Sequence, residues 1–287
     1  MPELPEVQAL AERMTADCAG RTIDHVDVLS IQVLKTFDPP VSALHGQAVE
    51  GVGRYGKFLD LRTVDGLHLV VHLARAGWIR HRASFTVRKP SAGRGPLALR
   101  IVLDDGTGFD VTEQGTTKRL AAYVVRDPQL IPGVARLGTD PLSDAFTPEV
   151  LAELASTARR RLKTFLTDQA VLAGIGNAYS DEILHAARLS PYAMASALTE
   201  GQGARLFTAV RETLGSALEH ARTATADALK AEKKAGLAVH GRAGEACPRC
   251  GDTVRSVVFA DKSLQYCPTC QTGGRVLADR RLSRLLK

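Results

Sequence analysis

Two pairs of cysteines near the end of the chain place the tightest constraint on its fold. They form the pattern Cys247-x2-Cys250-x16-Cys267-x2-Cys270, which is the spacing of a four-cysteine zinc ribbon. Four protein ligands leave no open coordination position, so we expect one structural Zn²⁺ and no catalytic metal. A redox function is the usual alternative for a single C-x-x-C motif, but it fits two pairs poorly. Because four of the five cysteines form C-x-x-C pairs and Cys18 stands alone, an intracellular metal site fits better than a disulfide scaffold.

The composition is that of a globular protein with a basic balance. The 287 residues are enough for two domains and a small module, and the net charge is +6 with a pI of about 9.2. This charge suits a polyanionic partner, although many basic proteins bind no nucleic acid. No run of 18 apolar residues and no signal peptide is visible, so we expect a cytoplasmic protein without a membrane partner.

The first seven residues, Met1-Pro2-Glu3-Leu4-Pro5-Glu6-Val7, indicate an amine nucleophile. Once the initiator methionine is removed, Pro2 carries a free secondary amine. An α-amino group has a pKa of about 7.7–8.0, so much of it can be unprotonated near neutral pH. Glu3 and Glu6 lie close enough in sequence to transfer protons. The alternative is an ordinary helix start, where proline and acidic residues are common.

The N-terminal half reads as one helix followed by a β-sandwich or barrel. Apolar residues recur at helical spacing over 5–18, and Asp65-Gly66 and Asp104-Asp105-Gly106 have the composition of hairpin turns. The predicted strands are 23–28, 57–61, 67–73, 98–103, 109–111 and 120–125. Residues 84–96 read as a mobile loop.

The C-terminal half reads as helical up to the cysteines. The predicted helices are 148–155, 162–167, 178–187, 196–207 and 209–225, and 224–245 reads as a linker. We therefore expect a catalytic β-sandwich domain over 1–130 and a helical domain over 131–240. A zinc finger over 241–275 and a basic tail over 276–287 follow. The basic residues in and next to the tail, Arg275, Arg280, Arg281, Arg284 and Lys287, either bind more DNA backbone or form a solvated helix face.

Three motifs together closely resemble the Fpg/Nei family of DNA glycosylases. They are the MPELPEV start, the segment Gly174-Ile-Gly-Asn177-Ala-Tyr-Ser-Asp-Glu182 and the paired cysteines, and the resemblance covers nearly the whole chain in the right order. It implies an α+β fold with an N-terminal helix plus β-sandwich domain, a C-terminal helix-two-turn-helix domain and a four-cysteine zinc-finger hairpin. It also implies action on damaged double-stranded DNA, and we expect a monomer.

The resemblance implies a bifunctional DNA glycosylase and AP lyase of base excision repair. Pro2 attacks C1′ to form a Schiff base, Glu3 serves as general acid and Glu6 positions the N-terminus or contacts the base. Lys57, in the segment Gly53-Arg-Tyr-Gly-Lys57, holds the phosphate beside the damaged nucleotide. β-Elimination and δ-elimination then cut both sides of the sugar. Without the resemblance, Lys57 reads as an exposed strand residue.

The resemblance also implies a set of DNA contacts, with departures. Asn177 contacts phosphates, and Lys163 is either another phosphate contact or a solvated lysine. Arg75 stands where the family inserts a methionine into the duplex void. Arg119 and Leu120 stand nearest to the arginine and aromatic wedge of the family, and leucine cannot stack as phenylalanine does. Lys262 replaces the finger-tip arginine, keeping its charge but losing bidentate recognition.

Because of these departures, the sequence leaves open which lesion is removed and whether catalysis is efficient. The segment 229–247 is short compared with the loop that 8-oxoguanine-specific members carry, which favours oxidised pyrimidines, ring-opened purines or bulkier adducts. One alternative is a damage- or abasic-site-binding protein of the same fold with weak or no catalysis. Another is a zinc-ribbon interaction module joined to an unrelated β domain, which predicts no preference for damaged DNA.

Overall fold

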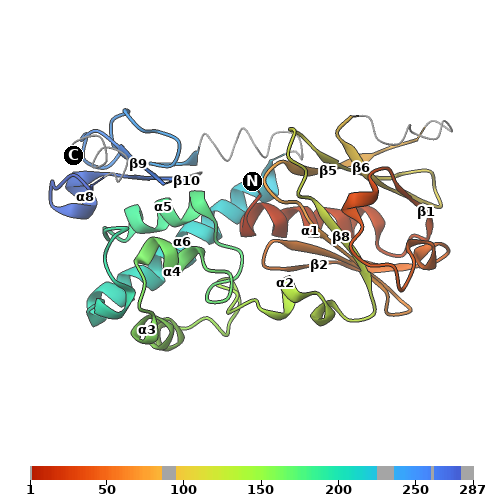
Figure 1. Ribbon diagram of the computed structural model, residues 1–287, viewed down its shortest axis with the longest axis horizontal. Helices are drawn as coiled ribbons and strands as arrows, with labels where there is room; N and C mark the ends of the chain where they lie inside the picture. Colours follow the sequence, from red (N-terminus) through yellow and green to blue (C-terminus); the bar gives the residue numbers. More distant parts are fainter. Residues whose placement is uncertain (1, 86–94, 225–235, 260–261, 279–287) are drawn as a thin grey trace. The chain divides into compact units, whose positions relative to one another are not determined.

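The chain forms two compact units with mixed helix and strand content (Figure 1). The computed structural model describes residues 2–85, 95–224, 236–259 and 262–278. The first unit runs to Leu137 and includes Ala224, and the second comprises Gly138–Thr223 and the described residues from 236 onward. In the described ranges, no helix is long and apolar enough to cross a membrane. The predicted α+β class is confirmed.

Two four-stranded antiparallel sheets make up most of the first unit. Their strand orders are β1-β6-β7-β5 and β2-β3-β4-β8. The strands are β1 (Ile23–Val28), β2 (Val49–Tyr55), β3 (Phe58–Thr63), β4 (His68–His72), β5 (Gly77–Arg82), β6 (Leu97–Leu103), β7 (Gly108–Glu113) and β8 (Ala121–Val125). Both predicted hairpin turns are present: Gly66 joins β3 to β4 at φ 79°, and Gly106 joins β6 to β7 at φ 81°, where glycine is favoured.

A single long helix, α1 (Leu4–Cys18), packs along β2 (Figure 1). Its start is a capping box in which the Glu3 side chain accepts from the backbone of Glu6, while the Glu6 side chain accepts from the backbone of Glu3. Leu4, Leu10 and Cys18 of this helix are buried. The predicted helix over 5–18 is therefore confirmed. Two short helical segments, η3 (Pro128–Leu130) and α2 (Pro132–Ala135), close this unit.

The second unit is helical, with one hairpin at its end. Its helices are α3 (Pro148–Thr157), α4 (Leu162–Thr167), α5 (Asn177–Ala186), α6 (Glu200–Thr223) and α8 (Pro268–Thr272), and its strands are β9 (Arg255–Phe259) and β10 (Lys262–Tyr266). α5 is the central element: it packs against α4, α6, β10 and α8, and almost all of its side chains are buried.

Three predictions differ from the structure. The two helices predicted at 196–207 and 209–225 are one helix, α6, because Leu206, Val210, Leu214 and Leu218 keep the same face buried across Thr208, which does not break the helix. β2 was not predicted, since two glycines weaken its strand signal, and neither was β5, which ends in exposed polar residues. Much of the predicted loop at 84–96, linker at 224–245 and tail lies outside the described residues.

Replacing Gly77 with alanine should destabilise the first unit. A Cβ atom at Gly77 would lie 2.0 Å from the Leu73 carbonyl oxygen, so the turn that leads into β5 would have to move. We expect Gly77→Ala to lower the free energy of unfolding by about 1–3 kcal/mol in urea titrations. Gly53→Ala in β2 is the matched control, since its Cβ would meet no atom within 4 Å. Equal stability of the two variants would contradict this packing.

Candidate active site and metal centre

The direction of α1 on β2 brings the N-terminus to one end of the first unit. The Thr15 hydroxyl donates to the Val52 carbonyl at 3.0 Å and accepts from the Val52 N–H at 2.8 Å. Nearer the start of the helix, Gln8 Oε1 accepts from Arg54 Nε at 3.0 Å. The helix therefore runs antiparallel to β2, and Pro2 lies toward the end at which β2 turns into β3.

Pro2 lies among buried acidic groups at this end. Pro2 itself is buried, and Glu3 and Glu6 are only 2% and 3% exposed. The Glu3 N–H donates to Glu6 Oε2 at 2.7 Å, so the capping box also fixes the backbone next to Pro2. The structure thus brings together the three residues that the sequence predicted as a catalytic group.

Lys57 lies in the tight turn between β2 and β3. Tyr55 pairs with Phe58, Gly56 adopts φ 51°, and its carbonyl oxygen accepts from Arg54 Nη1 at 3.2 Å. This turn shares an end of the unit with Pro2, because α1 runs antiparallel to the strand that leads into it. Lys57 therefore stands at the end of a strand and not within one.

His72 is a neighbour of Lys57 that sequence reasoning left without a role. Its ring lies 4.6 Å from the Phe58 ring, and β4 places it opposite Ala121 at the start of β8. Burial, followed by the positive charge of Lys57, lowers the pKa of His72 to about 4, so the imidazole is neutral near pH 7. A neutral ring beside Lys57 adds no further positive charge to the turn.

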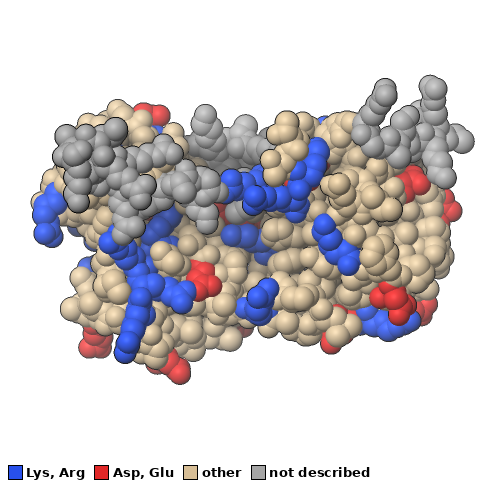
Figure 2. Space-filling view, viewed as in Figure 1, with Lys and Arg blue, Asp and Glu red and all other residues tan. Residues whose placement is uncertain are grey.

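Two arginine-bearing loops are joined near this end of the sandwich. The loop that carries Arg75 connects β4 to β5, and the loop that carries Arg119 connects β7 to β8. The Gln114 N–H donates to the Ala76 carbonyl at 3.2 Å, which links the two loops. Figure 2 shows Lys and Arg side chains gathered over the end of the first unit where Figure 1 marks the N-terminus. Both arginines are exposed, as a contact with a polyanion requires.

The buried carboxylate of Glu113 shapes the second of these loops. It is 2% exposed and accepts from the backbone N–H groups of Arg119 at 2.8 Å and Leu120 at 3.1 Å. Leu120 is only 2% exposed, so it packs in the core, whereas a wedge would have to stand on the surface. Trp78 in β5, the single tryptophan of the sequence, is also buried, at 5% exposed. Arg119 is exposed, as are residues 114–118 of the same loop.

In the second unit, an amide side chain holds the turn between α4 and α5. Gln169 Nε2 donates to the Ile175 carbonyl at 2.8 Å, and its Oε1 accepts from the Gly174 N–H at 2.9 Å. Asp168 accepts from the Ala170 N–H at 3.0 Å. The turn ends at Asn177, the first residue of α5, where backbone N–H groups at a helix start favour anions.

Lys163 lies inside this unit as part of an ion-pair network. Its Nζ donates to the Asn177 carbonyl at 2.7 Å, to Ser180 Oγ at 2.8 Å and to Asp181 Oδ1 at 2.6 Å. The other oxygen of Asp181 lies 2.6 Å from His240 Nδ1. Lys163 thus joins α4 to α5, a role that differs from both the phosphate contact and the solvated lysine considered from the sequence.

Asn177 connects α5 to the C-terminal hairpin. Its Nδ2 donates to the Ser263 carbonyl of β10 at 2.8 Å. Lys262 begins β10 and pairs with Phe259, but its side chain lies outside the described residues. Lys262 therefore directly precedes the residue whose carbonyl group accepts from Asn177.

Exposed arginines precede α4 in the same unit. Arg159, Arg160 and Arg161 are exposed; Arg160 pairs with Asp168, and the Arg161 guanidinium stacks 4.1 Å from the Tyr192 ring. Figure 2 shows Lys and Arg side chains gathered over this part of the second unit.

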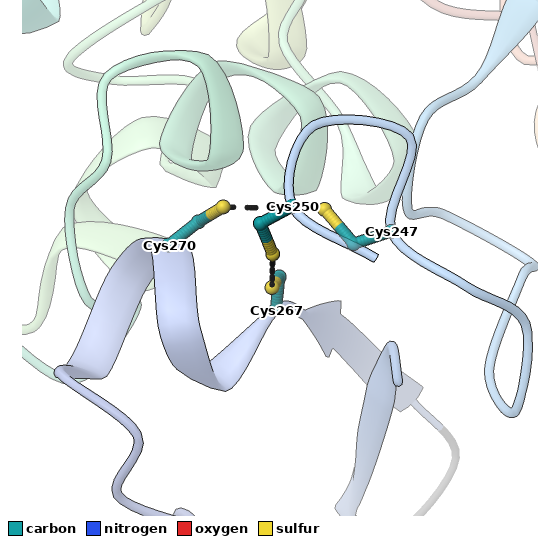
Figure 3. A group of neighbouring side chains, drawn as sticks. All are labelled: Cys247, Cys250, Cys267 and Cys270. Atoms are coloured by element: carbon teal, nitrogen blue, oxygen red, sulfur yellow. Dashed lines mark hydrogen bonds between the residues drawn. The ribbon is translucent and has the colours of Figure 1, made fainter. Parts of the chain in front are cut away.

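The four predicted metal ligands converge at one point (Figure 3). Their sulfur atoms all lie within 4.8 Å of one another, with Cys250 Sγ 3.4 Å from Cys267 Sγ and Cys247 Sγ 4.0 Å from Cys270 Sγ. Each C-x-x-C segment turns back on itself through a backbone bond, from Gly251 to Cys247 and from Gln271 to Cys267. Four sulfur donors at these separations fit one tetrahedral thiophilic cation.

Polar side chains of α5 hold the segment that enters this cluster. The Glu182 carboxylate accepts from the backbone N–H groups of Ala238 at 2.7 Å, Val239 at 2.9 Å and His240 at 2.7 Å. His185 lies against Cys247, and burial, followed by the charge of Arg249, lowers the pKa of His185. Sequence reasoning did not identify His185, since a histidine in a helix carries no motif.

Comparisons with known proteins identify the family. The profile of the formamidopyrimidine-DNA glycosylase N-terminal domain matches residues 1–119, that of the H2TH domain of the same glycosylase matches 137–228, and that of a zinc finger found in FPG and IleRS matches 244–273. A formamidopyrimidine-DNA glycosylase of Desulforamulus reducens is 32% identical over 94% of this chain and 99% of its own. The chain belongs to the formamidopyrimidine-DNA glycosylase family. The Fpg/Nei resemblance is thereby confirmed.

Two further relatives extend the comparison. An uncharacterized formamidopyrimidine-DNA glycosylase-like protein of Mycobacterium tuberculosis is 56% identical over 53% of this chain and 94% of its own. The crystal structure of the Lactococcus lactis formamidopyrimidine-DNA glycosylase, non-covalently bound to DNA with an AP site, matches with a TM-score of 0.81 at 25% identity. It covers 94% of this chain and 99% of that one. This chain therefore has the predicted helix-two-turn-helix domain and zinc finger.

Removing Lys163 should destabilise the second unit without requiring DNA. Lys163→Ala leaves the carboxylate of Asp181, which is 1% exposed, without its closest cation, and we expect a loss of about 3 kcal/mol in chemical unfolding. Arg160→Ala is the matched control, because its pair with Asp168 is exposed and should contribute at most about 1 kcal/mol. A Lys163→Ala protein as stable as Arg160→Ala would refute the structural role.

Proposed function

We propose that this chain is a bifunctional DNA glycosylase and AP lyase of base excision repair, acting as a monomer on damaged double-stranded DNA. Its membership of the formamidopyrimidine-DNA glycosylase family supports the glycosylase class. The single observation that carries the mechanism is the burial of Pro2 with Glu3 and Glu6 at the end of the first unit that bears the Lys57 turn.

The nucleophile is the secondary amine of Pro2 after removal of Met1. An α-amino group needs no large pKa shift to react near neutral pH, whereas a lysine does. The nearby carboxylates of Glu3 and Glu6 supply sites for proton transfer, and their buried position keeps them aligned with the backbone next to the amine.

The reaction begins when the damaged nucleotide leaves the duplex, because a stacked base shields its sugar carbon. The lone pair of the Pro2 nitrogen forms a bond to C1′ while the bond from C1′ to the base breaks. The departing base takes that electron pair together with the proton that the Pro2 nitrogen loses. Glu3 protonates the ring oxygen as the sugar opens, which gives the iminium intermediate.

Strand cleavage follows from the acidity that the iminium confers on C2′. Loss of a C2′ proton and departure of the 3′-phosphate oxygen with its electron pair complete β-elimination. A second proton loss and departure of the 5′-phosphate oxygen complete δ-elimination. Hydrolysis of the remaining iminium returns the Pro2 amine, so no redox equivalent is consumed.

Cationic and amide groups hold the backbone of the extruded nucleotide. Lys57 binds the phosphate beside it, and Asn177 at the start of α5 binds a flanking phosphate. Lys262 adds a charge from the hairpin. Arg75 and Arg119 enter the duplex from their two loops. The abasic-site DNA bound to the Lactococcus lactis relative supports this choice of partner.

One structural Zn²⁺ is held by Cys247, Cys250, Cys267 and Cys270. The separations of the sulfur atoms and the absence of an open ligand position support this choice, and the ion when bound supplies rigidity to the hairpin. Removal of this metal should therefore weaken DNA binding by the hairpin. The reaction at Pro2 does not use the metal.

The lesion class is a ring-opened purine, an oxidised pyrimidine or a bulky adduct. The shortness of the segment 229–247, of which 229–235 lies outside the described residues, supports this class. The burial of Leu120 supports the same conclusion, because the loop lacks an exposed apolar wedge. That observation also favours the second candidate, a protein that binds damage with little catalysis.

Borohydride trapping with a Pro2→Gly variant tests the proposal. Duplexes with an abasic site, 8-oxoguanine, formamidopyrimidine or 5-hydroxyuracil are incubated with protein and reductant, and covalent complexes are resolved on denaturing gels. We expect trapping on the abasic duplex and on at least one lesion duplex, with at least a tenfold loss in Pro2→Gly.

The matched control is Pro148→Gly, which changes an exposed proline at the start of α3 and should trap as the unchanged protein does. Tight binding to damaged duplex with no trapping would favour the binding-only protein. Equal trapping by Pro2→Gly would rule out the amine of Pro2 as the required nucleophile.

A further inference from the structure

The imidazole of His185 lies directly against the four-cysteine cluster. Its Nε2 is 3.2 Å from Cys247 Sγ, and the two residues are 5% and 2% exposed. Neither the motif spacing nor the family profile assigns a role to this helix position. A polar ring nitrogen at this depth has to be satisfied by its surroundings, and the sulfur is a hydrogen-bond partner that the structure provides.

His185 is not one of the metal ligands. The group of mutually close ligand atoms in the described residues contains the four sulfurs and does not include this ring. Four thiolates complete a tetrahedral zinc site, so a fifth donor is not needed. The imidazole therefore contacts the metal site through Cys247 and not through the ion.

We propose that His185 donates its Nε2–H to the Cys247 thiolate and positions that ligand for zinc. The inference rests on the proposed zinc centre and adds a residue to it. Four thiolates around one Zn²⁺ leave a net charge of −2, and a donated hydrogen bond stabilises the charge on one sulfur. Groups that hydrogen-bond to a ligand alter metal affinity by about 10–100-fold when removed.

The same contact fastens the first cysteine pair to α5. Arg249, between Cys247 and Cys250, donates from Nη1 to the carbonyls of His185 at 3.4 Å and Ala186 at 3.3 Å. The side-chain contact of His185 and the two backbone contacts of Arg249 are therefore both at the C-terminal end of α5. His185 is a positioning residue that sets where the sulfur lies relative to the helix.

The second cysteine pair is attached to the segment that follows the same helix. Gln271 Nε2 donates to the Leu189 carbonyl at 3.0 Å, and its Oε1 accepts from the Cys267 N–H at 2.9 Å. Because α5 begins at Asn177, one helix carries the proposed phosphate contact at its start and the metal-ligand contact near its end.

Zinc competition with a chromophoric chelator tests the proposal on the full chain. His185→Phe removes the donor and keeps a ring, while His185→Gln keeps an N–H donor. We expect His185→Phe to bind zinc at least about tenfold more weakly and His185→Gln to recover part of that loss. His220→Phe is the matched control, since His220 is exposed on α6 and bonds to Ser216; its zinc affinity should not change.

Two spectra of cadmium-substituted protein decide between the outcomes. ¹¹³Cd NMR should report four sulfur donors in the unchanged protein, and ¹⁵N NMR should show the His185 proton on Nε2 in the same sample, which requires no variant to fold. A three-sulfur, one-nitrogen signal, a proton on Nδ1 alone, or equal zinc affinity of His185→Phe would overturn the proposal. Failure of the unchanged protein to bind zinc would instead contradict the zinc centre.

Discussion

The antiparallel packing of α1 on β2 is the constraint on which the first unit's site depends. It brings the N-terminal proline to the end where β2 turns at Lys57, and the capping box of Glu3 and Glu6 fixes the chain there. An amine at a chain terminus is ordinarily mobile, and ordering it opposes conformational entropy. The buried helix start supplies that ordering before any DNA is bound, which is a form of preorganisation.

The second unit has a comparable organising element in α5. Its first residue reaches the hairpin, its buried acids hold Lys163 and the segment 238–240, and its last turn meets the metal ligands. Buried charges of this kind are stable only when each is paired, so the network acts as one assembly. The proposed phosphate contact and the proposed metal-ligand contact therefore lie at the two ends of one helix.

Sequence periodicity and motif spacing predict much of this. The bounds of α1 and β1, both glycine hairpins and the convergence of four cysteines all follow from local chemistry. What the sequence could not reveal depends on tertiary neighbours: the burial of Leu120 and the pairing of Lys163. The contact of His185 with a sulfur is of the same kind. A lysine or histidine in a helix looks the same from the sequence whether solvent or a carboxylate surrounds it.

The central claim is that the Pro2 nitrogen becomes covalently bonded to the sugar. Mass spectrometry of the borohydride-reduced complex tests it most directly, after nuclease trimming of the DNA and proteolysis of the protein. The account predicts a reduced sugar remnant on the N-terminal peptide, with Met1 absent and fragment ions that place the adduct on Pro2. An adduct on Lys57 or on any other lysine would contradict it.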